Sequence, residues 1–219
     1  MLEHSKIINN HEKIRQWVAM GESVQLEFKL QTPKPYKIAK TIGAFANSKG
    51  GRIIIGVLDN GEITGVVNPL KEQQLLLDAA QQYCRPSVAI KFDEHHLGHI
   101  IVVVATISQS KTKPHYSIGQ NGEENVYIRT NASTRIASKI VIKQLMNYYP
   151  DQQQFSRSLT SKEQGLISHL RRRENITLKE FMVLMNLSKR RARRMLVQLC
   201  QDQLIYEHTD QKEPYYTLA

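Results

Sequence analysis

The chain has 219 residues, with 30 Lys and Arg against 20 Asp and Glu, which gives a formal net charge of +10 at pH 7. This length suits one sizeable domain plus a small one, and an apolar content of 41% is typical of globular proteins and excludes a disordered or fibrous chain. The longest apolar run, Ile100 to Ile107, is far too short to span a bilayer, and two cysteines without CxxC spacing exclude a disulfide framework and favour a reducing, cytoplasmic compartment.

The first 149 residues interleave predicted helices with predicted hairpins. The apolar periodicity predicts helices at 8–19, 36–47, 70–83 and 138–149, and strands at 24–30, 53–57, 63–67, 88–92, 99–108 and 126–129. Asn60-Gly61 is a two-residue hairpin signal, so segment 63–67 is expected to pair with segment 53–57. A second hairpin is expected across Asp93–Gly98. This pattern predicts an α+β domain built around a mixed or antiparallel sheet.

A proline followed by a polar run marks a predicted linker at 150–157, between a domain at 1–149 and a smaller one at 158–219. The smaller domain is expected to hold a helix at 161–172, a helix that starts with a capping box at Thr177 and Glu180, and a helix at 188–201. Apolar segments at 204–206 and 215–218 then predict a hairpin. This order of elements resembles a winged helix-turn-helix domain.

The predicted helix at 188–201 combines an apolar stripe with dense positive charge. Ala192, Leu196 and Leu199 are spaced i, i+4 and i+7, which is one helix face, and basic residues fill the remaining arc. Such an excess of charge repels itself unless a polyanion neutralises it, so we predict contact with nucleic acid. The predicted contacts are Lys189, Arg190, Arg191, Arg193 and Arg194 in this helix and Arg171, Arg172 and Arg173 before it.

DNA is the favoured partner and RNA the alternative. Because lysine and arginine contacts to phosphate give affinity without reading bases, the charge alone does not indicate sequence specificity. A winged helix that reads a palindrome would favour a homodimer. The remaining interpretation is an adaptor whose basic helix meets an acidic protein.

Three motifs occur in order within the first domain: GESVQLEFK at 21–29, AFANSKGG at 44–51, and IGVLDNG at 55–61 with Gly65. Together with segments 127–129 and 133–135, they resemble the Schlafen-type Alba-like domain, a bacterial family described as DNA-binding. The resemblance covers nearly all of residues 10–148. We predict that Lys49, Arg129 and Arg135 add to the nucleic-acid contact.

The resemblance also implies a second function. In vertebrate Schlafen relatives, an acidic trio in these motifs supports metal-dependent cleavage of structured RNA, and by resemblance the trio falls on Glu22, Glu27 and Asp59. Carboxylate oxygens suit Mg²⁺ or Mn²⁺, which could stabilise charge on a phosphodiester. The alternative function is therefore a metal-dependent ribonuclease, whereas DNA binding alone requires no cofactor.

The spacing of the acidic trio leaves its geometry open. In a regular strand Glu22 and Glu27 face opposite sides and lie about 16 Å apart, so they converge only if the chain curls back near Gly21. Asp59 precedes Asn-Gly and is equally explained as a turn residue. Lys29 either steadies a substrate phosphate or pairs with Glu27.

Two further motifs are read as structural. The glycines at 50–51 lack the GxxxxGK[ST] pattern of a P-loop, so they indicate a helix stop and a close strand approach. His95, His96 and His99 surround the second predicted hairpin turn and are interpreted as a solvated loop in preference to a metal site. The sequence thus predicts a cytoplasmic DNA-binding transcriptional regulator that does not enter membranes.

Overall fold

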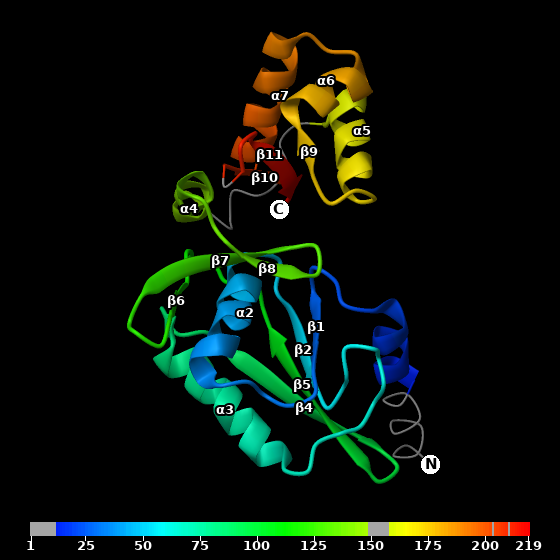
Figure 1. Ribbon diagram of the computed structural model, residues 1–219, viewed down its shortest axis with the longest axis vertical. Coiled ribbons are helices and arrows are strands. Elements are labelled where there is room, and N and C mark those ends of the chain that lie inside the picture. The colour runs from blue at the N-terminus through cyan, green and yellow to red at the C-terminus, as the bar shows by residue number, and fades with distance from the viewer. Residues whose placement is uncertain (1–11, 149–157, 203, 210) are drawn as a thin grey trace. The chain divides into compact units, whose positions relative to one another are not determined.

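A computed structural model describes residues 12–148, 158–202, 204–209 and 211–219 (Figure 1). Its residue contacts divide the chain into two units. The N-terminal unit holds the described residues up to Ser110 together with His115–Arg135, and the C-terminal unit holds Lys111–Pro114 and the described residues from Ile136 onward. The predicted linker at 150–157 lies outside the described residues. No helix in the described ranges is long and apolar enough to cross a membrane.

The N-terminal unit contains a helix at 12–20 and two longer helices, α2 (Pro35–Asn47) and α3 (Pro69–Gln82). Its strands are β1 (Leu26–Lys29), β2 (Gly51–Ile55), β3 (Cys84–Arg85), β4 (Ile90–Leu97), β5 (Ile100–Ile107), β6 (Tyr116–Ile118), β7 (Glu124–Thr130) and β8 (Ser133–Ile136). They form two four-stranded sheets, of order β1-β2-β5-β4 and β3-β6-β7-β8. β1 and β2 are parallel, whereas β2, β5 and β4 pair antiparallel, so the first sheet is mixed and the α+β class is confirmed.

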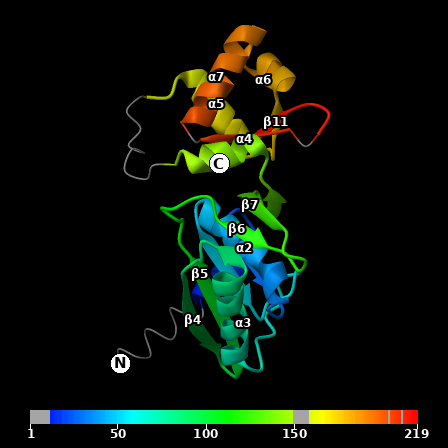
Figure 2. The same ribbon diagram turned by 90° about the vertical axis from the view of Figure 1, so that its left-hand side faces the viewer.

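β2 lies at the centre of the first sheet and is apolar on both faces. Ile53 and Ile55 belong to the core beneath α2 and α3, which cover one face of the sheet in Figure 2. Ile54 belongs to a second core, which includes Ile14 of the helix at 12–20. All three β2 isoleucines are fully buried, and burying such a side chain stabilises the fold by about 1.5–3 kcal/mol.

The prediction of a strand at 63–67 is wrong. Only an isolated bridge joins Val57 to Ile63, because both edges of β2 are already occupied by β1 and β5. The chain instead makes a tight turn in which the Leu58 amide donates to the Glu62 carbonyl at 2.9 Å. Gly56 then lies against Gly65 at a φ of +100°, and a Cβ on Gly56 would fall 2.8 Å from the Gly65 Cα. The glycines of this motif therefore permit a close backbone approach.

Asn47, at the end of α2, joins this helix to the second sheet. Its side-chain amide donates to the carbonyls of His115 and Tyr127 at 2.9 Å each, and its oxygen accepts from the His115 amide at 2.7 Å. The next residue, Ser48, accepts a hydrogen bond at Oγ from the Arg129 amide at 2.9 Å. Because Asn47 and Ser48 are buried and hydrogen-bonded, this part of the AFANSKGG motif has an architectural role.

The β4–β5 hairpin is longer than predicted. Segment 93–97, expected to be a loop, continues as strand β4, and the turn falls at Gly98 and His99. His95 is only 7% exposed and meets the Trp17 ring edge-on, with 6.3 Å between ring centroids. Burial lowers the pKa of His95. The interpretation of His95 as a solvated loop residue is therefore wrong.

The described residues of the C-terminal unit form helices α4 to α7 and a three-stranded sheet (Figure 1). The helices are α4 (Lys139–Met146), α5 (Ser161–Leu170), α6 (Leu178–Met185) and α7 (Lys189–Gln201). The strands β9 (Ile176–Thr177), β10 (Ile205–His208) and β11 (Tyr215–Leu218) pair antiparallel in the order β10-β11-β9. Capping boxes start α5 at Thr160 and α6 at Thr177, and the second of these confirms the predicted one.

Helix α4 was predicted to close the first domain, but it belongs to the C-terminal unit. Two polar contacts hold it there. The Ser138 hydroxyl donates to the Glu207 carbonyl at 3.2 Å, and the Gln144 side-chain amide donates to the Cys200 carbonyl at 2.9 Å. The observed division of the chain therefore falls before α4, whereas the predicted boundary at 149 falls after it.

Candidate nucleic-acid interface

Helix α7 forms where the sequence predicts it and buries the predicted stripe. Ser188 occupies the N-cap position, and Ala192, Leu196 and Leu199 are fully buried in the core of the C-terminal unit. The same core includes Phe181 of α6. This packing fixes the rotation of α7 about its axis, so its remaining arc faces outward.

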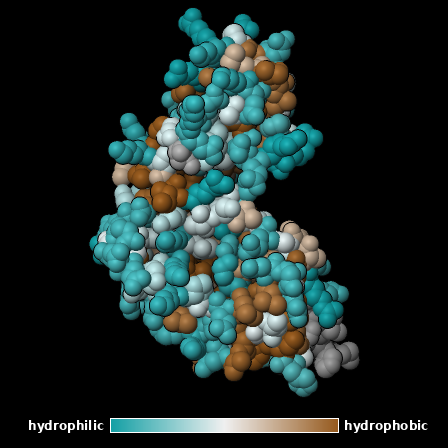
Figure 3. All heavy atoms as spheres, viewed as in Figure 1, coloured by the Kyte–Doolittle hydropathy of each residue, from teal (hydrophilic) through white to brown (hydrophobic). Residues whose placement is uncertain are grey.

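The outward arc of α7 carries five cations, all of them exposed: Lys189, Arg190, Arg191, Arg193 and Arg194. Within the described residues, no carboxylate forms an ion pair with any of them. In Figure 3, hydrophilic side chains cover the visible edge of this helix. Unneutralised cations at this density create a local positive potential that attracts a polyanion.

A tight turn sets the angle between α6 and α7. Asn186 adopts a left-handed conformation with a φ of 46°, and the Leu187 amide donates to the Met182 carbonyl at 2.9 Å. Lys162 of α5 donates from Nζ to the Met185 carbonyl at 2.8 Å. The turn preceding α7 is therefore held by hydrogen bonds from both sides. Sequence reasoning missed this turn, although asparagine is a common left-handed residue.

Arg171, Arg172 and Arg173 are exposed in the turn that follows α5. Figure 1 places this turn at the end of the C-terminal unit opposite to the start of α7. The two basic clusters that the sequence predicted as one contact therefore lie at different ends of the unit.

The three cations predicted in the N-terminal unit have different environments. Lys49 and Arg135 are exposed, as an electrostatic contact requires. Arg129 is only 1% exposed and lies in an ion pair with Glu27. A guanidinium buried in this way cannot reach a phosphate, so the prediction that Arg129 contacts nucleic acid is wrong. An indication was present in the sequence, because Arg129 follows the apolar strand residues 126–128.

The two terminal nitrogens of the buried Arg129 guanidinium belong to a hydrogen-bond network that joins the two sheets. Its Nη1 donates to Glu27 Oε2 at 2.7 Å and to Thr134 Oγ1 at 3.0 Å, and its Nη2 donates to the Ser23 carbonyl at 2.8 Å. The guanidinium carbon lies 4.8 Å from the centre of the Phe45 ring. Buried ion pairs need such additional hydrogen bonds, because desolvating both charges is costly.

The chain curls back at Gly21, which is the geometry required for Glu22 and Glu27 to converge. Gly21 has a φ of 73°, and Glu22 Oε1 accepts a hydrogen bond from the Phe28 amide at 2.9 Å. Lys29 Nζ lies 2.7 Å from Glu27 Oε1 and 4.0 Å from Glu22 Oε1. Of the two roles considered for Lys29, the structure shows the pairing with Glu27.

This arrangement does not fit a divalent cation. Each carboxylate oxygen of Glu27 is already paired with a cation, and Glu22 Oε1 satisfies the backbone of an edge strand. Asp59 is exposed in the turn between Leu58 and Glu62. Among the described residues, no three His, Cys, Asp or Glu side chains are grouped to hold a metal ion. The acidic trio is thus divided between an ion-pair network and a turn.

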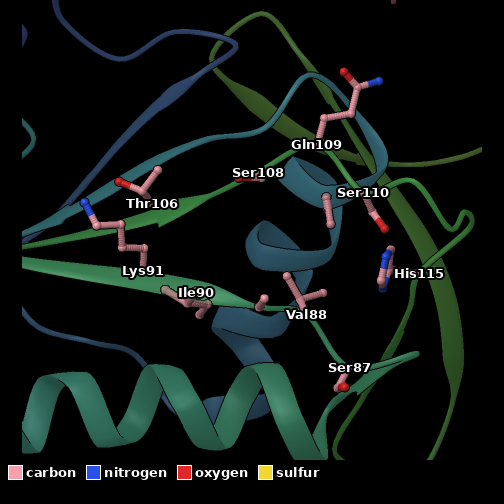
Figure 4. A pocket seen from close by; sticks show the side chains of 11 residues that line it. Ser87, Val88, Ile90, Lys91, Thr106, Ser108, Gln109, Ser110 and His115 are labelled. Atoms are coloured by element: carbon pink, nitrogen blue, oxygen red, sulfur yellow. The ribbon is translucent and has the colours of Figure 1, made fainter. Parts of the chain in front are cut away.

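A separate cavity of about 420 Å³ lies where β4 and β5 diverge (Figure 4). Its walls carry Ser87 and Val88 from the segment before β4, Ser108 and Ser110 from the segment after β5, and His115. The His115 ring approaches the Pro86 carbonyl through Nδ1 at 2.8 Å. No Asp or Glu lines this cavity, so it does not provide a carboxylate metal site either.

The chain matches a known protein family. The profile described as Schlafen, AlbA_2 matches residues 22–138, which is more than half of the chain. The chain belongs to the Schlafen, AlbA_2 family. Membership confirms the resemblance stated for the first domain. The matched residues include both Glu27 and Arg129. In this Schlafen, AlbA_2 protein, residues 139–219 lie outside the family match.

Comparison with curated proteins gives no match. Among solved structures, the N-terminal domain of a RecG-related protein from Nitrosomonas europaea is 21% identical, with a TM-score of 0.44 over 59% of this chain and 90% of that one. The DIP2311 protein from Corynebacterium diphtheriae is 14% identical, with a TM-score of 0.48 over 78% of this chain and 39% of that one.

Proposed function

We propose that this Schlafen, AlbA_2 protein is a DNA-binding transcriptional regulator that contacts duplex DNA through α7. The observation that carries the proposal is the exposed arc of five cations on a helix whose opposite face is fixed in a core. Family membership supports nucleic-acid binding in general. The choice of duplex DNA rests on the C-terminal unit.

The order of elements in that unit supports a winged helix-turn-helix. Helix α5, strand β9, helices α6 and α7, and the hairpin of β10 and β11 follow one another as in that domain class, with α7 in the place of the recognition helix. The basic residues lie mainly in the first two turns of α7, which is the part that enters the major groove in such domains. We further propose a homodimer that reads two half-sites.

The first test compares two double variants within the C-terminal unit by fluorescence anisotropy with labelled duplex DNA. Arg190→Ala with Arg194→Ala removes two charges from α7, and we expect duplex affinity to fall at least about tenfold, because each lost phosphate or base contact weakens binding by roughly 1 kcal/mol. The matched control, Arg172→Ala with Arg173→Ala, removes the same charge at the other end of the unit. Equal losses in both variants, or a larger loss in the control, would refute the assignment of α7.

The second test separates binding from cleavage. Purified protein is incubated with labelled duplex DNA and with folded tRNA, in Mn²⁺ or in EDTA, and run on native and denaturing gels. The proposal predicts intact, retarded duplex under both conditions. Shortened RNA that forms only with metal and disappears in Glu27→Gln would replace the proposal with a metal-dependent ribonuclease.

A further inference from the structure

A cleft of about 450 Å³ lies within the C-terminal unit, between α4 on one side and the end of α7 with the β10–β11 hairpin on the other. This size is within the range of small-molecule sites in proteins. Its lining residues come from α4 and, much later in the sequence, from α7, β10 and β11, so the cleft exists only in the folded unit.

The lips of the cleft are apolar and accessible. Ile140 of α4 is 40% exposed, and Val197 of α7 is 49% exposed. Figure 3 shows hydrophobic side chains gathered over α4. Cys200 extends the apolar surface inward, and burial raises the pKa of its thiol to about 12, so it remains a neutral thiol at physiological pH. An apolar group that enters between these lips removes exposed hydrocarbon from water.

Glu207 and Gln144 present acceptor oxygens to the cleft. The Tyr216 hydroxyl donates to Glu207 Oε1 at 2.9 Å, while no hydrogen bond is observed to Glu207 Oε2 from any described residue. Gln144 donates from Nε2 to the Cys200 carbonyl, and its buried Oε1 has no partner among the described residues. An acceptor left unsatisfied in this way gains most from a ligand that donates. The one cation of the lining, Lys143, is exposed.

We infer that this cleft binds a small organic amine, with its apolar body between Ile140 and Val197 and its ammonium group on the Glu207 carboxylate. Gln144 Oε1 is the second acceptor, reached after a rotation of the amide. A carboxylate ligand is disfavoured, because Glu207 would repel it and would leave both acceptors without a donor.

The position of the cleft gives the ligand a regulatory role, which rests on the function proposed above. Val197 and Cys200 lie in the second half of α7, and the cationic arc occupies the first half. The Gln144 side chain donates a direct hydrogen bond from α4 to the Cys200 carbonyl of α7, so an amine that recruits Gln144 alters the support of the helix that contacts DNA. Binding and regulation can be tested separately.

Binding is tested on the full chain with three probes of similar shape: benzylamine, benzyl alcohol and benzoate. Each is titrated into ¹⁵N-labelled protein, and NMR reports the Gln144 side-chain amide and the Val197 amide. We expect saturable shifts with benzylamine, weaker ones with benzyl alcohol and none with benzoate. Absence of shifts from all three probes, or equal shifts from benzoate, would overturn the inference.

Two variants locate the site. Glu207→Gln keeps an acceptor for the Tyr216 hydroxyl but removes the charge, and it should weaken benzylamine binding about tenfold while leaving benzyl alcohol unchanged. Val197→Trp fills the cleft from an exposed position and should abolish binding of both. Glu174→Gln removes an exposed carboxylate elsewhere in the unit and should change neither. If Glu174→Gln weakens benzylamine as much as Glu207→Gln does, the cleft is not the site.

The regulatory step is read from duplex affinity in the absence and presence of saturating benzylamine, with Val197→Trp as the insensitive control. Unchanged affinity would overturn the regulatory role while leaving ligand binding intact. If the duplex does not bind at all, the proposed function fails, whereas the NMR titration still decides whether the cleft binds amines.

Discussion

Arg129 of the N-terminal unit and the α7 arginines of the C-terminal unit have opposite environments. Arg129 in the N-terminal unit is buried, forms an ion pair with Glu27 and hydrogen-bonds two further oxygens. Arg190 and Arg194 in the C-terminal unit are exposed and form no ion pair with a described carboxylate. These arginines contribute equally to the net charge of the chain, but their structural roles differ. A buried, paired charge contributes to the integrity of the fold, whereas an exposed, unpaired charge is available to a partner.

The same comparison applies to the acidic residues of the family motif. Glu27 is neutralised by Arg129 and Lys29 within the protein, so its charge is already compensated. The α7 cations have no such compensation. The predictions below test this distinction, beginning with the largest expected effect.

Arg129→Met should destabilise the N-terminal unit severely. The substitution leaves Glu27 as a nearly buried carboxylate with only Lys29 beside it, and breaking a buried pair in this way lowers the free energy of unfolding by about 3–5 kcal/mol. Trp17, the single tryptophan of the chain, lies in this unit and reports its urea unfolding by fluorescence.

The double variant Glu27→Gln with Arg129→Met sharpens this test. Because it removes the uncompensated charge, it should recover part of the lost stability relative to Arg129→Met alone. A loss in Arg129→Met of less than about 0.5 kcal/mol, the range typical of surface substitutions, would mean that the pair is not a structural element.

The α7 arginines should affect salt dependence instead of stability. If Arg190 and Arg194 each neutralise one phosphate, the slope of log affinity against log salt for duplex binding should fall in magnitude by about 1.8 in the double alanine variant. The urea unfolding of the variant should match that of the native chain within about 0.5 kcal/mol. A normal salt slope in the variant would show that these side chains do not contact phosphates.

Glu180 is an intermediate case, an exposed carboxylate that is nevertheless held by hydrogen bonds. The Thr177 backbone amide donates to Glu180 Oε2 at 2.7 Å, and the Thr177 hydroxyl donates to the same oxygen at 2.9 Å. These hydrogen bonds, that of the amide first, lower the pKa of the Glu180 carboxyl. A lowered folded pKa stabilises the protein above the unfolded value, near 4.5, and this contribution is lost as the pH falls through the folded pKa.

Thermal unfolding followed by circular dichroism between pH 6 and pH 3 checks this effect. Glu180→Gln keeps the capping-box geometry without a titratable group, so its stability should decline slightly less than that of the native chain over this range. Identical declines would show that the capping bond does not depend on charge. The effect is small because Glu180 is exposed to solvent.

The elements with strong periodicity were predictable from the sequence. Helices α2, α3 and α7 lie within two residues of their predicted bounds, because Pro35, Pro69 and Ser188 mark their starts and apolar stripes mark their faces. The short strands β3 and β9 have only two residues each and no periodicity, so no local signal predicts them. Each pairs with a strand far along the chain, β3 with β6 and β9 with β11.

The site was less predictable, for a physical reason. The turn signal of Asn60-Gly61 is real, but strand pairing for 63–67 depends on whether an edge of β2 is free, and β1 and β5 occupy both edges. Similarly, charge alone does not distinguish the buried Arg129 from the exposed Arg135. It also does not distinguish the basic residues of α7 from those in the turn after α5. Which charges meet a partner inside the protein is decided by contacts between residues far apart in the chain.

The Glu27–Arg129 pair joins positions 102 residues apart, and this separation has a consequence for synthesis of the chain. During translation Glu27 leaves the ribosome long before Arg129, so the N-terminal unit cannot complete its interior until β7 has emerged. In the C-terminal unit the capping boxes and the β10–β11 pairing join neighbours in sequence and can form as soon as they appear. Because contacts between distant positions slow folding, the larger unit is the one that remains exposed to aggregation or to chaperones while the nascent chain grows.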